Sequence, residues 1–399
     1  MAQDGGSYDK FLVNALVGVG GITFDDVTVK EVILGESLLT PGLQTAVTLQ
    51  SFVYSPQPKD WGSFKNKQLS LSMSDQTGRF MDVRQTLYRI DNRELDINVG
   101  QTESLTLHAC DPTLLDDGRH LVSQSWKCVR PSAIVEEVLQ SCVNARNPVV
   151  DSAGPARDYI AENIHPFQVI AQQANVALYN DSNPDFLHYM TYENSQSGQG
   201  THYFRSLKYL ETRNVKATFT NTEGGVGDIA DGGKAISFSF PCDFDLLSDI
   251  LNGVDADGSI INTLSTINPF NQAGSLFGGS MAGGPCGGLG GGNHKTSTTN
   301  SGSAQQQNAC EMSVEKYLLL RQARMALLEK DKIAFRITVP WRPDLHVGDL
   351  IGFLFREKPY SSGGSLYGTD SYLIVALKHN IQFGGFATST FDCIKTNIG

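Results

Sequence analysis

The stretch ENIHPFQVIAQQANVALYNDSNPDFLHYMTYENSQSGQGTHYFRSLKYL, from Glu162 to Leu210, decides how this chain folds. The pair His165-Pro166 predicts the start of a helix, because proline at the first helical position gives up no hydrogen bond. The run 180–185, made of Asn, Asp, Ser and Pro residues, predicts where this helix stops.

One face of this helix is expected to be buried. Five apolar residues fall on that face with a 3.6-residue period: Phe167, Ile170, Ala171, Ala174 and Leu178. The segments 186–192 and 202–210 follow, and their alternating aromatic residues predict two strands covered on both faces. The unit is therefore α-β-β, and its aromatic surfaces suit packing better than catalysis.

Strand patterns dominate the rest of the sequence. The first set of predicted strands is VTVKEVIL (27–34), LQTAVTLQSFVY (43–54), KQLSLSM (67–73), RQTLYRI (84–90) and ESLTLHAC (103–110). Short strands at this spacing predict a small barrel or sandwich. A helix over 131–142 follows, with Ser132 as its expected N-cap.

A second set of predicted strands is split by about ninety residues. Its members are VKATFT (215–220), KAISFSF (234–240), IAFRITV (333–339), DLIGFLF (349–355), YLIVALKHNI (372–381) and FATSTFDCIK (386–395). Since a few strands cannot form a stable sheet alone, both halves are expected to share one discontinuous domain. The interruption holds a Gly-rich tract, 274–308, followed by a predicted helix from Ser313 to about Lys330. The tract's composition favours flexibility, as either a surface loop or a segment ordered by a partner.

Composition narrows the classes of protein to which the chain can belong. The length of 399 residues predicts two to four domains, and the net charge of −11 argues against a surface built to hold phosphates. The seven cysteines are scattered without a CxxC pair, which predicts reduced structural thiols. The residues at the N-terminus lack the basic region of a signal peptide, and no apolar run is long enough to span a membrane. Folding in a cytoplasm is the expectation.

Motifs for nucleotides and metals fail on identifiable residues. The segment 227–235 suggests a phosphate loop, but Asp228 replaces a required glycine and Ala235 replaces the metal-binding hydroxyl residue. Gly18-Val19-Gly20-Gly21 lacks the third glycine of a dinucleotide fingerprint and is predicted to be a turn. The stretch 255–258 resembles a calcium loop, yet its twelfth position is Thr266 rather than glutamate.

Other catalytic patterns fail in the same way. Cys286 and His294 have no partner ligands at metal-site spacing, and Ser275, Ser280 and Ser365 lack the spacing of a nucleophile elbow. Six histidines in strands or at helix caps are expected to be hydrogen-bonded structural residues: His108, His165, His188, His202, His346 and His379. Two carboxylates brought together by folding could still act as a glycosidase, because sequence does not reveal that distance. No catalytic, cofactor-binding or metal residue is therefore assigned, and no interface residue is named.

Four segments in order carry a resemblance to a known family. They are 122–143, the pair HPFQVIAQQANVAL and 186–210, then 244–269, and finally ITVPWRPDLHVGDLIGFLF with YLIVALKHNI and STFDCIK. Together they resemble the baseplate central hub protein of contractile-tailed bacteriophages, within the superfamily of late-control proteins and secretion-spike hubs. The Gly-rich tract departs from the family pattern, and there is no fused lysozyme or needle module. Cleavage and puncture are therefore expected to belong to other chains.

The resemblance implies a β-rich α+β fold with two tail-tube-like antiparallel β-barrel domains and intervening α/β domains. The implied boundaries are 1–112 for the first barrel, 113–214 for an α/β hub domain, 215–245 plus 333–399 for the second barrel, and 246–332 for an inserted domain with the Gly-rich loop. Three chains would form a ring whose six barrels give pseudo-sixfold symmetry. Such a ring would also cover exposed strand edges.

The resemblance also implies a function without enzymatic activity or cofactor. The ring would join a hexameric tail tube to a trimeric central spike, contact other baseplate proteins and leave a channel through which phage DNA passes without specific binding. The protein would be assembled in the host cytoplasm, would not insert into a membrane and would reside in the virion tail baseplate. Two alternatives remain: a tail-associated cell-wall hydrolase, and the hub of a contractile secretion or injection spike.

Overall fold

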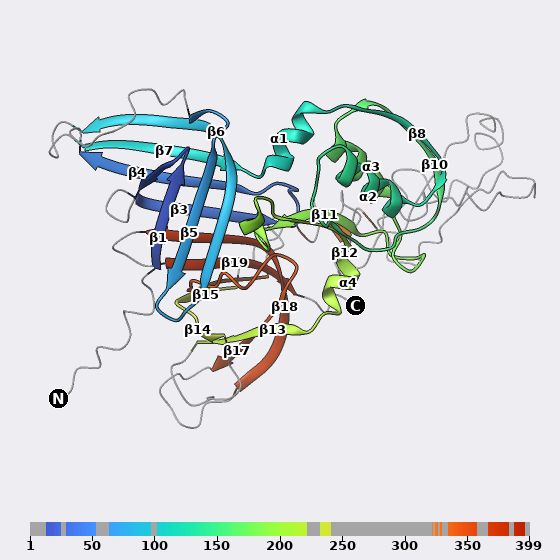
Figure 1. The fold of residues 1–399 in the computed structure, drawn as a ribbon. Coiled ribbons are helices and arrows are strands. Elements are labelled where there is room, and N and C mark those ends of the chain that lie inside the picture. The colour runs from blue at the N-terminus through green and yellow to red at the C-terminus, as the bar shows by residue number, and fades with distance from the viewer. Residues whose placement is uncertain are drawn as a thin grey trace, which may run out of the picture.

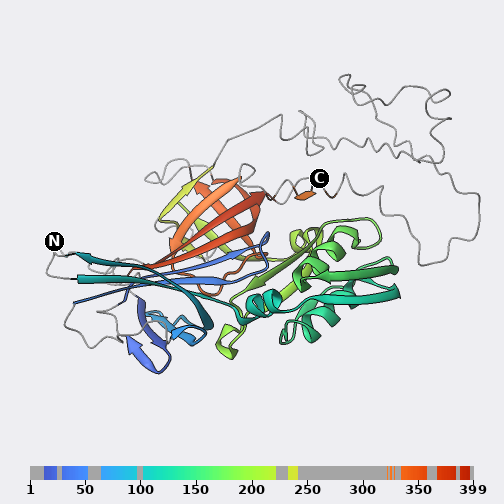
Figure 2. The same ribbon diagram turned by 90° about the horizontal axis from the view of Figure 1, so that it is seen from above.

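The computed structural model describes most of the chain in separate ranges. These are residues 13–24, 29–52, 64–96, 102–221, 232–240, 321, 324, 325, 328, 334–356, 366–382 and 387–395. Within them, two strand sets lie side by side, and a layer of helices and short strands lies at one end of both (Figures 1 and 2).

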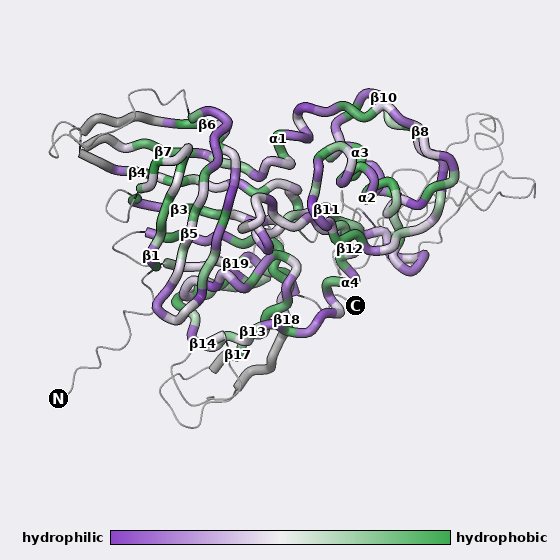
Figure 3. Tube along the Cα trace, viewed as in Figure 1, coloured by the Kyte–Doolittle hydropathy of each residue, from purple (hydrophilic) through white to green (hydrophobic). Residues whose placement is uncertain are grey.

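The first strand set forms a two-layered, partly open barrel. Its strands are β1 (Val13–Val19), β2 (Ile22–Phe24), β3 (Val29–Ser37), β4 (Gln44–Phe52), β5 (Gln68–Asp75), β6 (Phe80–Asp96) and β7 (Thr102–Cys110). They pair in the order β3-β4-β7-β6-β5-β1-β2. The long strand β6 belongs to both layers, since its first half pairs with β5 and its second half with β7. Hydrophobic and hydrophilic residues alternate along these strands, so one face of each layer packs inward (Figure 3).

The second strand set closes into a ring. Its strands are β13 (Val215–Thr220), β14 (Gly233–Lys234), β15 (Ser237–Ser239), β16 (Phe335–Pro340), β17 (Leu350–Arg356), β18 (Leu366–Gln382) and β19 (Ala387–Lys395). The segment 232–239 completes the ring, because its β14 half pairs with β13 and its β15 half pairs with β16. Strand β13 runs parallel to both β14 and β17, so the sheet is mixed rather than purely antiparallel.

One strand pair joins both sets. Strand β18 pairs antiparallel with β3 over seven residue pairs, from Ala376↔Ser37 to Gln382↔Glu31. As a result, fourteen strands in the described residues belong to one continuous sheet. The prediction of a β-rich α+β fold is confirmed, and the two sets are physically fused along β18 and β3.

The α/β layer carries the unit identified from the sequence. Its elements are α1 (Pro112–Arg119), β8 (Val122–Val129), α2 (Pro131–Ser141), β9 (Val149–Val150), β10 (Arg157–Ile164), α3 (Pro166–Val176), β11 (Phe186–Thr191), the 3₁₀ helix Ser195–Ser197, β12 (Thr201–Ser206) and α4 (Leu207–Glu211). Helix α3 begins at Pro166 with His165 as its N-cap, as predicted. All six residues of β11 are buried, which confirms a strand covered on both faces.

Three hydrophobic clusters hold the molecule together. One fills the first strand set, one fills the second, and one lies between α2, α3 and the adjoining strands. The clusters share elements: Met190 and Tyr192 pack into the first, whereas Leu187 and Tyr189 pack into the second. Alternate faces of β11 thus point into different cores. The domain boundaries given above stay a prediction.

Several local predictions are wrong for physical reasons. Ser132 is not the N-cap of α2, because Pro131 already occupies the first turn and the Ser132 hydroxyl bonds to the backbone of Ala153. In α3, Ala171 is exposed, and Gln173 is buried in its place.

Two further differences concern the strand end and a cysteine. The strand predicted over 202–210 ends at Ser206. The Ser206 hydroxyl accepts a hydrogen bond from the Tyr209 backbone N–H and so caps α4. Cys128 is disulfide-bonded, which contradicts the prediction of reduced thiols at this position. Other predictions lie outside the described residues: those on the Gly-rich tract, on 244–269, on 255–258 and on most of the helix from Ser313.

Candidate functional site

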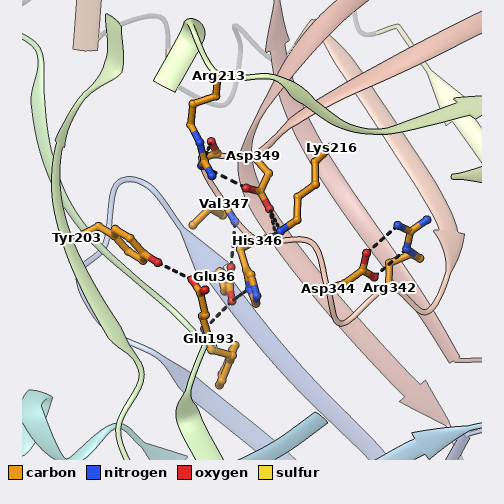
Figure 4. Close-up of polar contacts among 12 residues, drawn as sticks. Glu36, Glu193, Tyr203, Arg213, Lys216, Arg342, Asp344, His346, Val347 and Asp349 are labelled. Atoms are coloured by element: carbon orange, nitrogen blue, oxygen red, sulfur yellow. Dashed lines mark hydrogen bonds and ion pairs between the residues drawn. The ribbon is translucent and has the colours of Figure 1, made fainter. Parts of the chain in front are cut away.

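The two strand sets and the α/β layer meet around one buried carboxylate. Glu36 occupies an inward-facing position of β3 and is only 3% exposed. Its oxygens accept hydrogen bonds from the Tyr192 backbone N–H at 2.7 Å, the Val347 backbone N–H at 3.0 Å and His346 Nδ1 at 2.9 Å (Figure 4). Tyr192 follows β11, while His346 and Val347 lie in the loop between β16 and β17. We call these four residues the Glu36 junction.

The Glu36 junction is an ion pair. Burial alone raises the pKa of Glu36, but the His346 charge and the three hydrogen bonds outweigh burial and leave the pKa lower than usual. Burial likewise lowers the pKa of His346, yet Glu36 outweighs it and the net pKa of His346 is raised. Both groups are therefore charged near neutral pH, and each compensates the other's desolvation.

A second carboxylate continues the polar network towards the surface. Asp349 accepts hydrogen bonds from Lys216 Nζ at 2.8 Å and from the His346 backbone N–H at 3.0 Å. It also forms an ion pair with Arg213 at 3.2 Å (Figure 4). These contacts tie the loop before β17 to the start of β13. A cavity of about 440 Å³ opens beside them, lined by Tyr209 as well.

Within the α/β layer, a chain of buried hydrogen bonds runs from strand to helix. Thr113 donates to Asp111 Oδ1 at 2.6 Å, so its oxygen is left to accept from His202 Nε2 at 3.1 Å. His202 Nδ1 then accepts from His188 Nε2 at 3.1 Å. Burial lowers the pKa of His202 to about 3 and that of His188 well below its usual value, so both rings are neutral. These histidines are structural, as expected from the sequence.

Two arginines that precede β16 in the chain, Arg321 and Arg324, bind the α/β layer. Arg324 lies between the buried carboxylates of Asp185 and Glu211, at 3.1 and 3.0 Å. Arg321 donates to the backbone oxygens of Pro184 and Phe186, both at 3.1 Å. The chain entering the second strand set from the insertion is thereby attached to the α/β layer.

The outer face of the fused sheet is lined by small, mostly uncharged side chains. We call it the hydroxyl-lined face. Its half-buried residues on β16, β19, β18, β3, β4 and β7 are Thr338, Thr388, Thr390, Ala376, Asn380, Ile33, Gly35, Ser37, Ala46, Thr48, Ser104 and Thr106. Threonine hydroxyls meet across strands, Thr338 with Thr390 at 3.1 Å.

Four charged residues on the hydroxyl-lined face form pairs, whereas the exposed Lys378 and the half-buried Glu31 of this face make no ion pair within the described ranges. Arg336 contacts Asp392 at 2.5 Å on neighbouring strands. At the other end, Asp91 contacts both Arg89 and His108. The face therefore combines low net charge with many short hydroxyl groups.

The residues that the sequence singled out for chemistry lie apart or outside the described ranges. No group of three or more metal-ligating side chains lies together in those ranges. In Gly18-Val19-Gly20-Gly21, the first two residues end β1 and the last two form the turn to β2 with positive φ, so the predicted turn is present at Gly20-Gly21. The segment 227–235 is described only from Gly232, and Cys286, His294, Ser275, Ser280 and Ser365 lie outside the described residues. Among the described helices, none has the length and apolarity needed to cross a membrane.

Sequence reasoning named no site residue and missed the Glu36 junction. One signal was present: in VKEVILGES the inward positions are Val29, Val32, Leu34 and then Glu36. A carboxylate on the buried face of a strand requires partners. The sequence alone could not supply those partners, because they lie more than 150 residues away.

Comparisons with known proteins identify solved structures with a similar fold. No protein-family model and no curated protein matches the sequence. The 43 kDa tail protein of prophage MuSo2 from Shewanella oneidensis is 9% identical with a TM-score of 0.54, over 96% of this chain and 98% of that one. A tail protein from Neisseria meningitidis MC58 is 11% identical with a TM-score of 0.55, over 96% of each chain.

A third structure is more distant. It is an E. coli component of the type VI secretion system, described as structurally similar to the T4 bacteriophage tail proteins gp27 and gp5. It is 9% identical with a TM-score of 0.49, over 95% of this chain and 76% of that one. The first two matches show that this chain shares its fold with two phage tail proteins.

Proposed function

We propose that this chain is the structural hub of a phage tail baseplate. Three copies form a ring of six barrels that joins the hexameric tail tube to the trimeric central spike and leaves a channel for DNA. The partners are other copies of the chain, the spike, the tube or its initiator, and neighbouring baseplate proteins. The role is structural rather than enzymatic, and the protein resides in the virion tail.

The observation that carries this proposal is the pairing of β18 with β3. It fuses two strand sets into one sheet, so each chain presents two similar curved walls at a fixed angle. A trimer of such chains supplies six walls, which matches a sixfold partner on one side and a threefold partner on the other. The Glu36 junction supports the same role, because it fixes the α/β layer against both walls.

The hydroxyl-lined face supports the channel. A conduit for DNA should not retain phosphates, since each Lys or Arg contact adds affinity through counterion release. On this face, Arg336 is neutralised by Asp392 and Arg89 by Asp91, and the chain carries a net charge of −11. A wall of hydroxyls with little net charge, on which Lys378 and Glu31 lie outside these two pairs, suits the passage of a polyanion.

Electron microscopy of the purified protein tests the hub role, alone and with its tail neighbours. We expect a threefold ring with an open centre and six barrels around it. A protein that stays monomeric both alone and with the spike would contradict the proposal. A ring whose bore is lined mainly by Lys and Arg would overturn the account of the channel.

Zymography on cell walls tests the non-enzymatic part of the proposal. We expect no clearing by the purified protein. Clearing that disappears when one carboxylate is changed would favour the hydrolase alternative. Neighbouring genes for a capsid and terminase are expected for a phage hub, and their absence would favour a secretion-spike hub.

A further inference from the structure

A second cavity, of about 740 Å³, lies in the α/β layer next to the one beside Asp349. Its walls are the segment after β9, the turn after α3, and α4, which contributes Tyr209. The volume falls within the roughly 300–1,000 Å³ typical of small-molecule sites. The hub role makes no use of this cavity.

The walls of this cavity are fixed in place. Gly154 and Leu178 exchange backbone hydrogen bonds at 3.2 and 2.8 Å, which ties one wall to the other. The turn is closed by hydrogen bonds between Tyr179 and Asn183. Asp181 adopts a positive φ there, and its oxygen lies 3.2 Å from where a Cβ on Gly154 would be. The cavity is therefore preformed rather than a gap between mobile loops.

The floor of the cavity leaves hydrogen-bonding capacity unused. Asp151 Oδ2 is buried and has no hydrogen-bond partner within the described protein. Arg205 Nε forms an ion pair with the other oxygen of Asp151 at 3.6 Å, which is longer than a hydrogen bond. The Asp151 side chain is 22% exposed and lines the cavity, so its carboxylate can accept a hydrogen bond from a ligand that donates there.

Two tyrosines give the cavity its apolar surface. The rings of Tyr179 and Tyr209 lie edge to face with centroids 6.3 Å apart, and both line the cavity. The Arg205 guanidinium lies 5.3 Å from the centre of the Tyr209 ring and 4.7 Å from that of Tyr203, which holds Tyr209 in position. Rings combined with polar groups favour a ligand that has both an apolar face and hydroxyls.

From this arrangement we propose that the cavity is a binding site for a neutral oligosaccharide. The charged residues lining it are Arg130, Asp151 and Asp181, so cations are not in excess and a phosphate or acidic ligand is disfavoured. The polar side chains around the rings exclude a lipid tail. A sugar offers hydroxyl donors for Asp151 and C–H faces for the tyrosine rings.

Calorimetric titration of the full chain tests the proposal with three probes: maltotriose, cellotriose and triacetylchitotriose. We expect at least one to bind with a Kd of about 1 mM or tighter. Asp151→Asn should weaken binding by about tenfold or more, because a hydrogen bond to a charged acceptor is lost. Tyr209→Phe keeps the ring and should retain binding within about threefold, whereas Tyr209→Ala should abolish it.

Matched controls separate binding from folding and from the hub role. Tyr88→Ala removes an exposed tyrosine on β6 and should leave binding unchanged. Thermal unfolding of each variant shows whether it is folded, and Asp151→Asn together with Tyr209→Phe keeps the test valid if Tyr209→Ala fails to fold. The absence of binding by all three sugars, or binding indifferent to both Asp151→Asn and Tyr209→Ala, would overturn the proposal. Ring formation seen by electron microscopy is independent of this result.

Discussion

At the scale of single residues, Glu36 has the largest expected effect. It belongs to the first strand set and accepts hydrogen bonds both from the α/β layer and from the loop before β17. Removing one member of a buried ion pair leaves the other charge uncompensated. Its position on β3 makes the geometry of all three parts depend on one carboxylate.

We expect Glu36→Gln to lower the free energy of unfolding by about 3 kcal/mol, because His346 loses its counter-charge. Glu36 stabilises the fold above its unfolded pKa near 4.5, and this contribution is lost as the pH falls through its lowered folded pKa. His346 stabilises the fold below its unfolded pKa near 6.5, and this is lost as the pH rises through its raised folded pKa. The difference from the wild type should therefore be largest between these two values.

Denaturant unfolding over a pH series measures this effect. Glu31→Gln is the matched control, since Glu31 lies on the same strand in a half-buried outward position. It should change stability by less than about 0.5 kcal/mol. Equal losses in both variants would show that the Glu36 junction has no special role.

The buried histidines predict sensitivity to acid. Burial lowers the folded pKa of His202 to about 3, while the unfolded chain binds a proton near pH 6.5. Between those values the unfolded state holds the extra proton, so stability falls by about 1.4 kcal/mol for each pH unit of acidification. His202→Gln should remove this share of the slope, measured by urea unfolding between pH 7 and pH 4.

An exposed histidine provides the control for acid sensitivity. His120 lies at the end of α1 and is exposed, so His120→Gln should leave the slope unchanged. A wild-type slope that His202→Gln does not reduce would contradict the assignment of a neutral buried ring.

At the scale of elements, the sequence predicted most of what local pattern determines. Strands β3, β4, β5 and β7 agree with prediction because inward and outward residues alternate, and α3 begins where His165-Pro166 indicates. The end of β12 was missed, because the cap at Ser206 depends on a hydroxyl geometry that periodicity does not reveal. Ring closure by 232–239 and the β18–β3 pairing could not be predicted, since both join segments far apart in sequence.

Closure of the second strand set can be tested at one glycine. A Cβ at Gly232 would lie 2.6 Å from the Thr218 backbone oxygen and 2.8 Å from the Phe219 ring. Gly232→Ala should therefore push the closing segment off β13 and lower the thermal midpoint of unfolding. The loss is expected to be about 1–3 kcal/mol, as for other overpacked positions.

A glycine with free space around it is the control for closure. Gly118 in α1 has nothing within 4 Å of its would-be Cβ. Gly118→Ala should be neutral or stabilising by up to about 1 kcal/mol, because alanine favours a helix. If both alanine variants behaved alike, the tight contact at Gly232 would not matter for closure.

At the scale of the whole molecule, the hydroxyl-lined face makes a prediction about DNA. The wild-type chain should not bind a short DNA duplex measurably at physiological salt, as judged by fluorescence anisotropy. Replacing Thr48 and Thr390 with lysine adds two cations to β4 and β19 of this face, one opposite Glu31 and one opposite Lys378. The double variant should bind the duplex, with a log affinity that falls with log salt by about 0.9 for each phosphate contacted.

A matched double variant separates charge from shape. Thr48→Gln with Thr390→Gln adds similar bulk without charge and should not bind. Binding by the glutamine variant, or by the wild type, would contradict the idea that the face avoids phosphates. Unfolding midpoints of both variants should stay close to that of the wild type, because the two threonines are only half-buried.

The β18–β3 pairing also has a mechanical consequence. Seven consecutive residue pairs join the two walls in antiparallel register. A pull along these strands loads all of their backbone hydrogen bonds in shear at once, whereas a pull across the seam would open them one after another. In the proposed hub role, this seam would resist thrust towards a spike best along the strand direction. The fused sheet therefore acts as a rigid connection between the two strand sets rather than as a hinge.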